Sequence, residues 1–198
     1  MRCDRGQTLP IYIWLSGILL FVAFAFFAFA QAASARSGAQ SAADAAALAA
    51  AQDAREELVL GLETAIGNAD ADWLDWLDGD LFPGNGADAA ARRLAAQNDS
   101  AVQGAAQRVV VNGYPGYRVE IKTNYTVGDS IIPGTESMRA KAHAQAVIKP
   151  RCDFDLEADP KKPVVLDCDG ETIDIDPGDF RPDDLPEASV LFSVYLAE

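Results

Sequence analysis

The hydrophobic pattern begins with an apolar run over residues 11–30, which is 20 positions without a charged side chain. A helix rises about 1.5 Å per residue, so this run would span roughly 30 Å, the thickness of a membrane's hydrocarbon core. It continues without a break into an alanine-rich segment with scattered polar residues, 31–54. The pattern predicts one long helix, with a transmembrane part over residues 9–35 and a short cytoplasmic N-terminus over residues 1–8.

A cleaved signal peptide is the alternative interpretation of the same segment. Its charged start would be residues 1–7, and Ala28-Phe29-Ala30 or Ala33-Ser34-Ala35 could serve as the cleavage site. The apolar run is longer than the usual signal-peptide core, and the helical pattern continues beyond both sites. These two features favour a retained anchor.

The flanking charges predict how this helix is oriented in the membrane. Arg2 and Arg5 precede the apolar run, whereas Arg36 alone follows it closely. Basic residues next to a membrane helix remain preferentially in the cytoplasm. We therefore expect a single pass, with the large C-terminal part outside the cytoplasm.

The alanine-rich segment places small and large side chains on different faces of the expected helix. At about 100° per residue, one face collects small residues and is the predicted packing face for a partner helix: Ala32, Ala35, Ala39, Ala42, Ala46 and Ala50. The opposite face carries larger residues, which we expect to contact the protein's own soluble domain: Leu58, Leu62 and Ile66. Alanine is also the strongest helix former, which is a simpler explanation for its abundance alone.

Helical patterns continue to about residue 104, so residues 36–104 are predicted to be an alanine-rich helical region. Gly67-Asn68 is expected to end the long helix, a short helix is expected after Asp72, and another over residues 87–102. From Arg108 the period changes to two, and an antiparallel β domain is predicted over residues 105–198. The fold class is therefore α+β, a long N-terminal helix with a small antiparallel-sheet domain.

The strands of this domain follow from alternating apolar positions separated by turn residues. They are expected at residues 108–111, 117–127, 138–148, 164–166, 172–175 and 188–196. The two longest are expected to pair antiparallel, and 164–166 with 172–175 to form a hairpin across Asp169-Gly170. The last strand is apolar on both faces, so we expect it to be well covered.

Charge and cysteine content narrow the possible partners. The formal net charge is −14, and residues 152–198 hold 14 acids against Lys161, Lys162 and Arg181, a net of −11. Such a balance argues against nucleic acid, whose phosphates need clustered Lys and Arg. Cys152 and Cys168 both lie in the part expected outside the cytoplasm, where disulfides persist, so we predict that they form one.

Candidate catalytic and metal-binding groups are few. The acidic string 167–171, with Asp174 and Asp176, offers oxygen ligands for calcium but lacks EF-hand spacing, so a solvated acidic turn is favoured. His143 is the only histidine and is expected to face solvent, and the chain has no nucleophile motif and no glycine-rich phosphate loop. We therefore predict no catalytic residue, metal site, cofactor, small-molecule substrate or enzymatic activity.

The N-terminal quarter also resembles a known family. Asp4-Arg5-Gly6, the apolar span and the string SAADAAALAA over residues 41–50 resemble the N-terminus of TadE/TadG-like proteins, the pseudopilin-like components of Flp (tight-adherence) pilus assembly. Prepilin-peptidase substrates usually carry Glu five residues after the cleaved Gly, where this chain has Ile11.

The resemblance implies a fold, a location and a role. It implies a pilin-like chain in the bacterial cell membrane, with a β-rich extracytoplasmic domain. Its role would be structural, with the N-terminal helix packing against partner pseudopilin helices. The alternative is a membrane-anchored extracellular binding module whose acidic C-terminal region takes a cation or a basic ligand.

Overall fold

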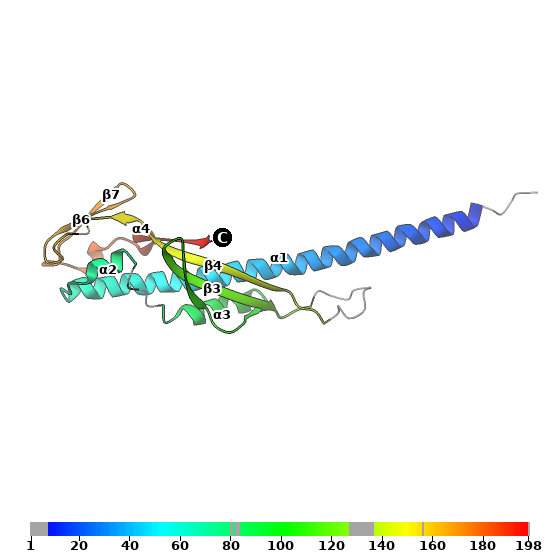
Figure 1. Ribbon diagram of the computed structural model, residues 1–198, viewed down its shortest axis with the longest axis horizontal. Coiled ribbons are helices and arrows are strands. Elements are labelled where there is room, and N and C mark those ends of the chain that lie inside the picture. The colour runs from blue at the N-terminus through cyan, green and yellow to red at the C-terminus, as the bar shows by residue number, and fades with distance from the viewer. Residues whose placement is uncertain (1–7, 80, 82–83, 127–136, 156, 198) are drawn as a thin grey trace, which may run out of the picture.

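One continuous helix forms the axis of the molecule. The computed structural model describes residues 8–79, 81, 84–126, 137–155 and 157–197. Helix α1, Thr8–Gly67, has 60 residues and would be about 90 Å long. Its N-terminal half projects alone from the rest of the molecule, and its C-terminal half carries the folded domain (Figure 1). The predicted long helix and its end at Gly67 are thus confirmed.

The main sheet is antiparallel and lies along the C-terminal half of α1. Its strands run in the order β1-β3-β4-β8, and β2 pairs with β3 on the same side as β1. Their bounds are β1 Ser100–Val102, β2 Gln107–Val111, β3 Tyr114–Thr123, β4 Lys141–Pro150 and β8 Phe192–Ala197. The predicted pairing of the two longest strands is confirmed, with Val119 opposite Ala144.

Two hairpins use turn residues that tolerate a left-handed backbone. Asn112 and Gly113 join β2 to β3 with φ of 53° and 85°, the positive values that a two-residue I′ turn requires. Asp169 and Gly170 have φ of 54° and 89° between β6, Val164–Cys168, and β7, Glu171–Ile175. The hairpin predicted across Asp169-Gly170 is therefore confirmed.

A second, three-stranded sheet caps the end of the molecule farthest from Thr8 (Figure 1). Strand β5, Cys152–Asp153, continues from the end of β4 and pairs with β6, which pairs with β7. The remaining elements are α2 Trp73–Leu77, α3 Ala87–Gln97, the 3-10 turn η1 Pro182–Asp184 and α4 Ala188–Leu191.

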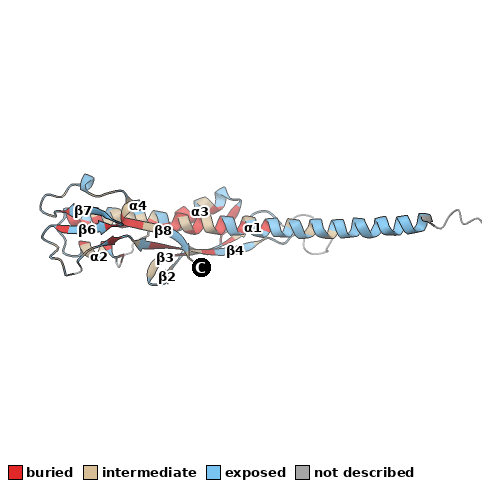
Figure 2. Ribbon diagram, turned by 90° about the horizontal axis from the view of Figure 1, so that it is seen from above, coloured by how far each residue is buried: buried red, intermediate tan, exposed pale blue. Residues whose placement is uncertain are grey.

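The core lies between α1 and the elements around it. Alternate residues of β3 and β4 are buried and belong to one cluster with the α1 alanines, among them Val119, Ile121, Ala146 and Ile148. Helix α3 packs on α1 as well, so α1 is covered on more than one side. Burial accordingly begins near the middle of α1, at Ala35 (Figure 2). The helical and sheet regions thus share a single core.

Two expected elements differ from the structure. The helix predicted over 87–102 ends at Gln97, because Asp99 takes a positive φ of 48° and redirects the chain into β1. The strand predicted over 188–196 begins with the helical turn α4, and β8 covers only its later part. Because β8 is an edge strand, Tyr195 and Leu196 stay 40% and 41% exposed, so the expectation of full cover was wrong.

Candidate functional site

The projecting half of α1 is the most unusual surface of the molecule. Fifteen large apolar side chains between Leu9 and Phe29 are exposed, and Phe29 reaches 82%. Fully burying one such side chain is worth about 1.5–3 kcal/mol, so leaving all of them in water would cost tens of kcal/mol. By length and composition, α1 is able to cross a membrane. This surface therefore requires an apolar environment outside the chain itself.

The exposed half gives way to a buried half within a few residues. Ala32 and Ala33 are still exposed, Ala35 is 6% exposed, and Ala39 is fully buried. Arg36, the first charged residue after the apolar run, lies at this boundary and is exposed. The side chains of one helix are therefore exposed and apolar before Arg36 and become part of the domain core after it.

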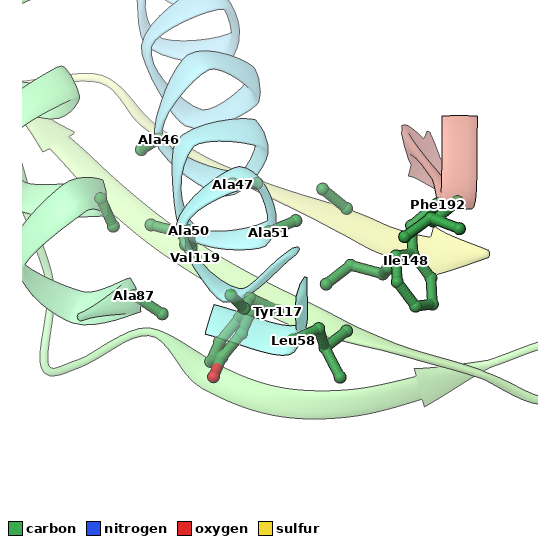
Figure 3. Packing of buried hydrophobic residues seen from close by; sticks show 14 of the residues in the cluster. Ala46, Ala47, Ala50, Ala51, Leu58, Ala87, Tyr117, Val119, Ile148 and Phe192 are labelled. Carbon is green, nitrogen blue, oxygen red and sulfur yellow. The ribbon is translucent and has the colours of Figure 1, made fainter. Parts of the chain in front are cut away.

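The alanine face proposed for a partner helix is mostly occupied by the chain's own domain, which corrects that expectation. Ala39, Ala42, Ala46 and Ala50 are 0% exposed, and Ala35 is 6% exposed. Of the six alanines predicted to form the packing face, only Ala32 is exposed to solvent. Figure 3 shows Ala46 and Ala50 above the sheet, close to Val119. A partner helix cannot reach these side chains while the domain is folded.

Helix α3 supplies a matching set of small residues. Its Ala87, Ala91 and Ala95 recur every four residues and are at most 1% exposed within the same cluster as the α1 alanines. Small side chains on both helices allow their backbones to approach closely. The four-residue spacing of these alanines is visible in the sequence. It indicates that α3 could itself pack against the α1 alanines, which the helical-wheel interpretation did not consider.

The larger residues of α1 lie farther along the helix, in the core. Leu58 and Leu62 are 0% exposed and Ile66 is 1% exposed. Beside them, Gly61 meets the Trp76 indole so closely that the ring leaves no room for an added Cβ. Trp73, also fully buried, donates from Nε1 to the Pro160 carbonyl at 2.9 Å. These contacts tie α1 to α2 and to the segment before β6.

The Glu57 carboxylate on α1 holds the start of α3. Glu57 accepts hydrogen bonds from the backbone N–H of Asn85 and of Gly86, both at 2.8 Å. An anion suits this position because a helix N-terminus carries unpaired N–H groups and partial positive charge. Asp88, in the first turn, accepts from Arg92 Nε at 2.7 Å and from Ala106 N–H at 2.9 Å.

Near the contact between α1 and the start of α3, the pKa values of two acids, Asp53 and Asp88, are shifted in opposite directions. Burial raises the pKa of Asp53, the Glu57 and Glu56 carboxylates add to the rise, and Arg93 opposes it. Oδ2 of Asp53 is buried and accepts no hydrogen bond from the described residues. The hydrogen bond from Arg92 lowers the pKa of Asp88, and the Ala106 N–H lowers it further.

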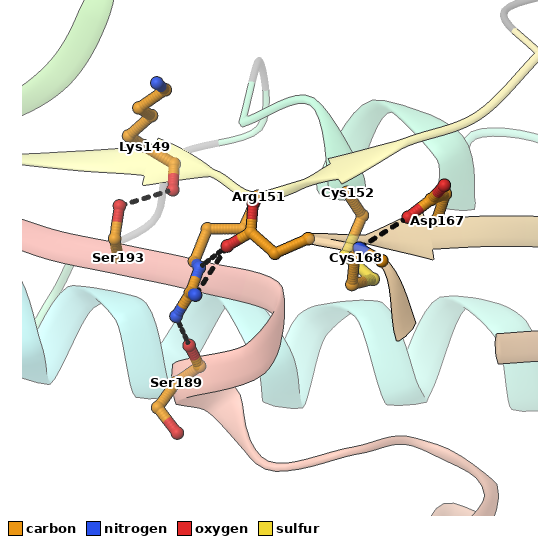
Figure 4. A network of polar contacts seen from close by, with 9 residues as sticks. Lys149, Arg151, Cys152, Asp167, Cys168, Ser189 and Ser193 are labelled. Carbon is orange, nitrogen blue, oxygen red and sulfur yellow. Dashed lines mark hydrogen bonds and ion pairs between the residues drawn. A yellow bond between two sulfur atoms is a disulfide. The ribbon is translucent and has the colours of Figure 1, made fainter. Parts of the chain in front are cut away.

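The predicted disulfide is present in the distal sheet. Cys152 on β5 and Cys168 on β6 lie directly opposite each other and are bonded. Arg151, next to Cys152, donates from Nε to Asp169 Oδ2 at 2.6 Å and from Nη1 to the Ser189 carbonyl at 2.8 Å (Figure 4). These bonds connect the end of β4, the β6–β7 turn and α4.

The acidic string and the histidine have simple structural surroundings. Asp167 Oδ1 accepts from the Gly170 N–H at 2.8 Å and so stabilises the turn between β6 and β7. His143 is exposed, and its backbone carbonyl accepts from Gln40 Nε2 at 3.3 Å. Within the described ranges, no three His, Cys, Asp or Glu side chains converge as metal ligands would.

Comparison with known families agrees with the N-terminal resemblance. Residues 6–53 match the family described as "Putative Flp pilus-assembly TadE/G-like". No curated protein and no solved structure gives a match. The matched segment covers the exposed half of α1 and the first buried turns but none of the sheet. The family resemblance is thus confirmed over this segment, and the match and the apolar helix fit a pilus-assembly component.

Proposed function

We propose that this chain is a single-pass, membrane-anchored structural component of a Flp-type pilus-assembly system, with its folded domain outside the cytoplasm. The observation that carries the proposal is the abrupt change along one helix from fifteen exposed large apolar side chains to fully buried alanines. The family match spans this same change. The charges of Arg2 and Arg5 support the orientation, because they would stay in the cytoplasm.

The partner helices of this component would contact the projecting half of α1. The alanines beyond Ala35 are already buried by α3 and the sheet, so they are not available for that contact. In the projecting half, Ser16 and Gly17 are small residues among large ones, and an added Cβ at Gly17 meets nothing within 4 Å. Small residues let membrane helices approach closely, so this is where we place the contact.

The test combines topology with co-purification from the native membrane. Protease added to intact spheroplasts should remove the folded domain, and detergent extracts should contain other single-helix pilus-assembly proteins bound to the chain. A domain that is fully protected would reverse the orientation. A chain recovered without membrane, or without any pilus-assembly protein, would contradict the proposed role.

Two matched variants test the place of the contact. Gly17→Leu should reduce the recovery of partner helices without affecting the domain, because no part of the chain lies near its added side chain. Ala23→Leu enlarges an exposed position about 120° away around the helix and should retain them. If both variants recover partner helices equally well, the partner does not contact the face of α1 that contains Gly17.

The acidic C-terminal part favours a second candidate function, an anchored module that binds a cation or a basic ligand. Residues 152–198 carry a net charge of −11, and the β6–β7 hairpin holds part of it at the far end of the molecule. This candidate predicts a soluble or wall-bound ligand in the extract instead of membrane proteins. The same co-purification therefore separates the two functions.

A further inference from the structure

The outer face of the main sheet is basic, although the chain as a whole is strongly acidic. The five strands of the sheet contain Arg108, Arg118, Lys122, Lys141 and Lys149 but only one acid, Glu120. Their net charge is therefore +4, in a chain of net charge −14. This contrast calls for an explanation, because nothing in the internal packing requires it.

Alternation along the strands places four of these cations on one side. Val119 and Ile121 of β3 and Ala144, Ala146 and Ile148 of β4 are buried on the α1 side. Successive side chains of a strand point to opposite faces, so Arg118, Lys122, Lys141 and Lys149 belong to the outer face. We call these four residues, together with His143, the basic face.

One end of the basic face, at the last pair of the β3–β4 ladder, holds an unfavourable pair of like charges. Lys122 and Lys141 are directly opposite each other in the β3–β4 ladder, an arrangement that destabilises a sheet. Glu120 is already paired with Arg118 at 3.2 Å, and no carboxylate of the described residues forms an ion pair with either lysine. A shallow hollow of about 240 Å³ beside them is lined by Gln103, Glu120, Lys141 and His143, among others.

A surface of the opposite charge lies at the distal end of the same chain. The β5–β7 sheet and the segment after it belong to residues 152–198, with a net charge of −11. Glu171 and Asp174 lie on β7, the edge strand of that sheet, and both are exposed. Because they are three positions apart, they point to opposite faces of the sheet, one on each side of its free edge. No hydrogen bond or ion pair from the described residues engages either carboxylate.

We propose that the basic face binds the acidic distal sheet of a second copy of this chain. Charge complementarity selects this partner, because strands β5, β6 and β7 together hold four acids and no base, opposite a main sheet whose strands have a net charge of +4. The proposal goes beyond the assembly role above and does not require it, since neither surface includes the projecting half of α1.

The two surfaces lie at different heights along α1, which determines the kind of assembly. His143 on the basic face is level with Gln40, and the segment before β6 is level with Trp73. Helix α2 packs against α1 at Gly61, and the helix between Gln40 and Gly61 corresponds to an axial offset of about 30 Å. Different patches that meet between copies form a heterologous contact, which repeats from copy to copy instead of closing into a symmetric dimer.

Sedimentation of the full-length chain in detergent micelles tests the contact. At about 50 mM salt we expect a concentration-dependent series of species larger than a dimer, and at about 500 mM an affinity weaker by about tenfold or more, because exposed charges are screened. Association that is unchanged at high salt would assign it to the apolar helix and overturn the proposal. A chain that stays monomeric at low salt, even if it binds polyglutamate, would overturn it as well.

Charge reversal identifies the surfaces. Lys122→Glu with Lys141→Glu should abolish the association, and Glu171→Lys with Asp174→Lys should do the same. Mixing the two variants restores an opposite charge at every contact, so the mixture should associate again. Lys161→Glu with Lys162→Glu changes the net charge by the same amount but leaves the basic face intact and makes the acidic region more negative, so this variant should associate at least as strongly as wild type. Undiminished association of the Lys122 and Lys141 variant would refute the proposal.

Carbodiimide coupling of the unmodified chain keeps the test independent of whether the variants fold. A mixture of isotopically labelled and unlabelled chains should give peptides in which Lys122 or Lys141 of one copy is joined to Glu171 or Asp174 of the other. Mixed-label links that join other regions only, or no mixed-label links under associating conditions, would contradict the assigned contact.

Discussion

At the residue scale, the alanines of α1 act as spacers inside the domain. Four of the six that the helical wheel placed on a partner face are 0% exposed, and the alanines of α3 face the same core. In such a position a methyl group is the largest side chain that fits without moving a neighbouring element. The value of alanine here is its small volume as well as its helix propensity.

Enlarging one of these alanines should therefore destabilise the domain itself. Ala46→Leu should lower the free energy of unfolding by about 1–3 kcal/mol, because it overpacks a fully buried site between α1 and the sheet. Urea unfolding followed by near-ultraviolet circular dichroism measures this. Ala32→Leu, at the exposed position, is the control and should unfold as wild type does. If the two variants were equally stable, the core would have room for a larger side chain at Ala46.

The two shifted carboxylates predict opposite effects of pH on stability. The raised pKa of Asp53 means that the folded state binds its proton more tightly, so this group lowers stability as pH rises through its folded pKa. Asp53→Asn should then stabilise the domain at neutral pH and lose that advantage in acid.

The lowered pKa of Asp88 means that its carboxylate contributes to the stability of the folded state at neutral pH. This contribution is lost as the pH falls through the folded pKa. Asp88→Asn should destabilise at neutral pH, and stability profiles of both variants against pH check the signs.

At the element scale, the distal sheet is short and depends on covalent and polar links. Strand β5 has two residues, and β6 and β7 have five each. The disulfide joins β5 to β6, and Arg151 joins the end of β4 to Asp169 and Ser189.

Removing the disulfide should destabilise the distal sheet of β5, β6 and β7 before the main sheet. In the chain-entropy model, closing a loop of about 15 residues is worth about 3 kcal/mol. Cys152→Ser with Cys168→Ser should cost about that much, and amide exchange should show faster opening of β6 and β7 than of β3 and β4. Uniformly faster exchange in both sheets would instead mean that the two sheets unfold together.

At the scale of the whole molecule, one helix joins two regions of different chemistry. Before Ala35 its side chains need an apolar environment, and after Ala39 they supply the core of the domain. The domain therefore contains about half of α1, α3 and both sheets. It has its own core without the projecting half.

A chain that begins at residue 32 should consequently fold and stay in solution without detergent. The removed segment carries all fifteen exposed large apolar side chains of the projecting half, and none of the buried residues of the core. Gel filtration, circular dichroism and formation of the Cys152–Cys168 bond measure this outcome. Aggregation of the truncated chain, or an unpaired Cys152 in it, would show that the domain needs the projecting half of α1.

The sequence by itself determined those features that depend on neighbours along the chain. The uncharged run of residues 11–30 is long enough to span a hydrocarbon core only as a helix, and the period of two makes β3 and β4 strands. Asn112-Gly113 and Asp169-Gly170 determined two hairpins, because few other residues accept their positive φ. The family match follows from the same N-terminal pattern.

Only the tertiary structure decided which surface covers the alanines of α1. Periodicity shows that a helix has a small-residue face, but the same face suits a partner helix or an internal one. The choice depended on Ala87, Ala91 and Ala95 of α3, which reach α1 through a connection of about twenty residues that has no periodicity of its own. Likewise, the opposition of Lys122 and Lys141 depends on the register of two strands, and register is a property of the pair rather than of either strand.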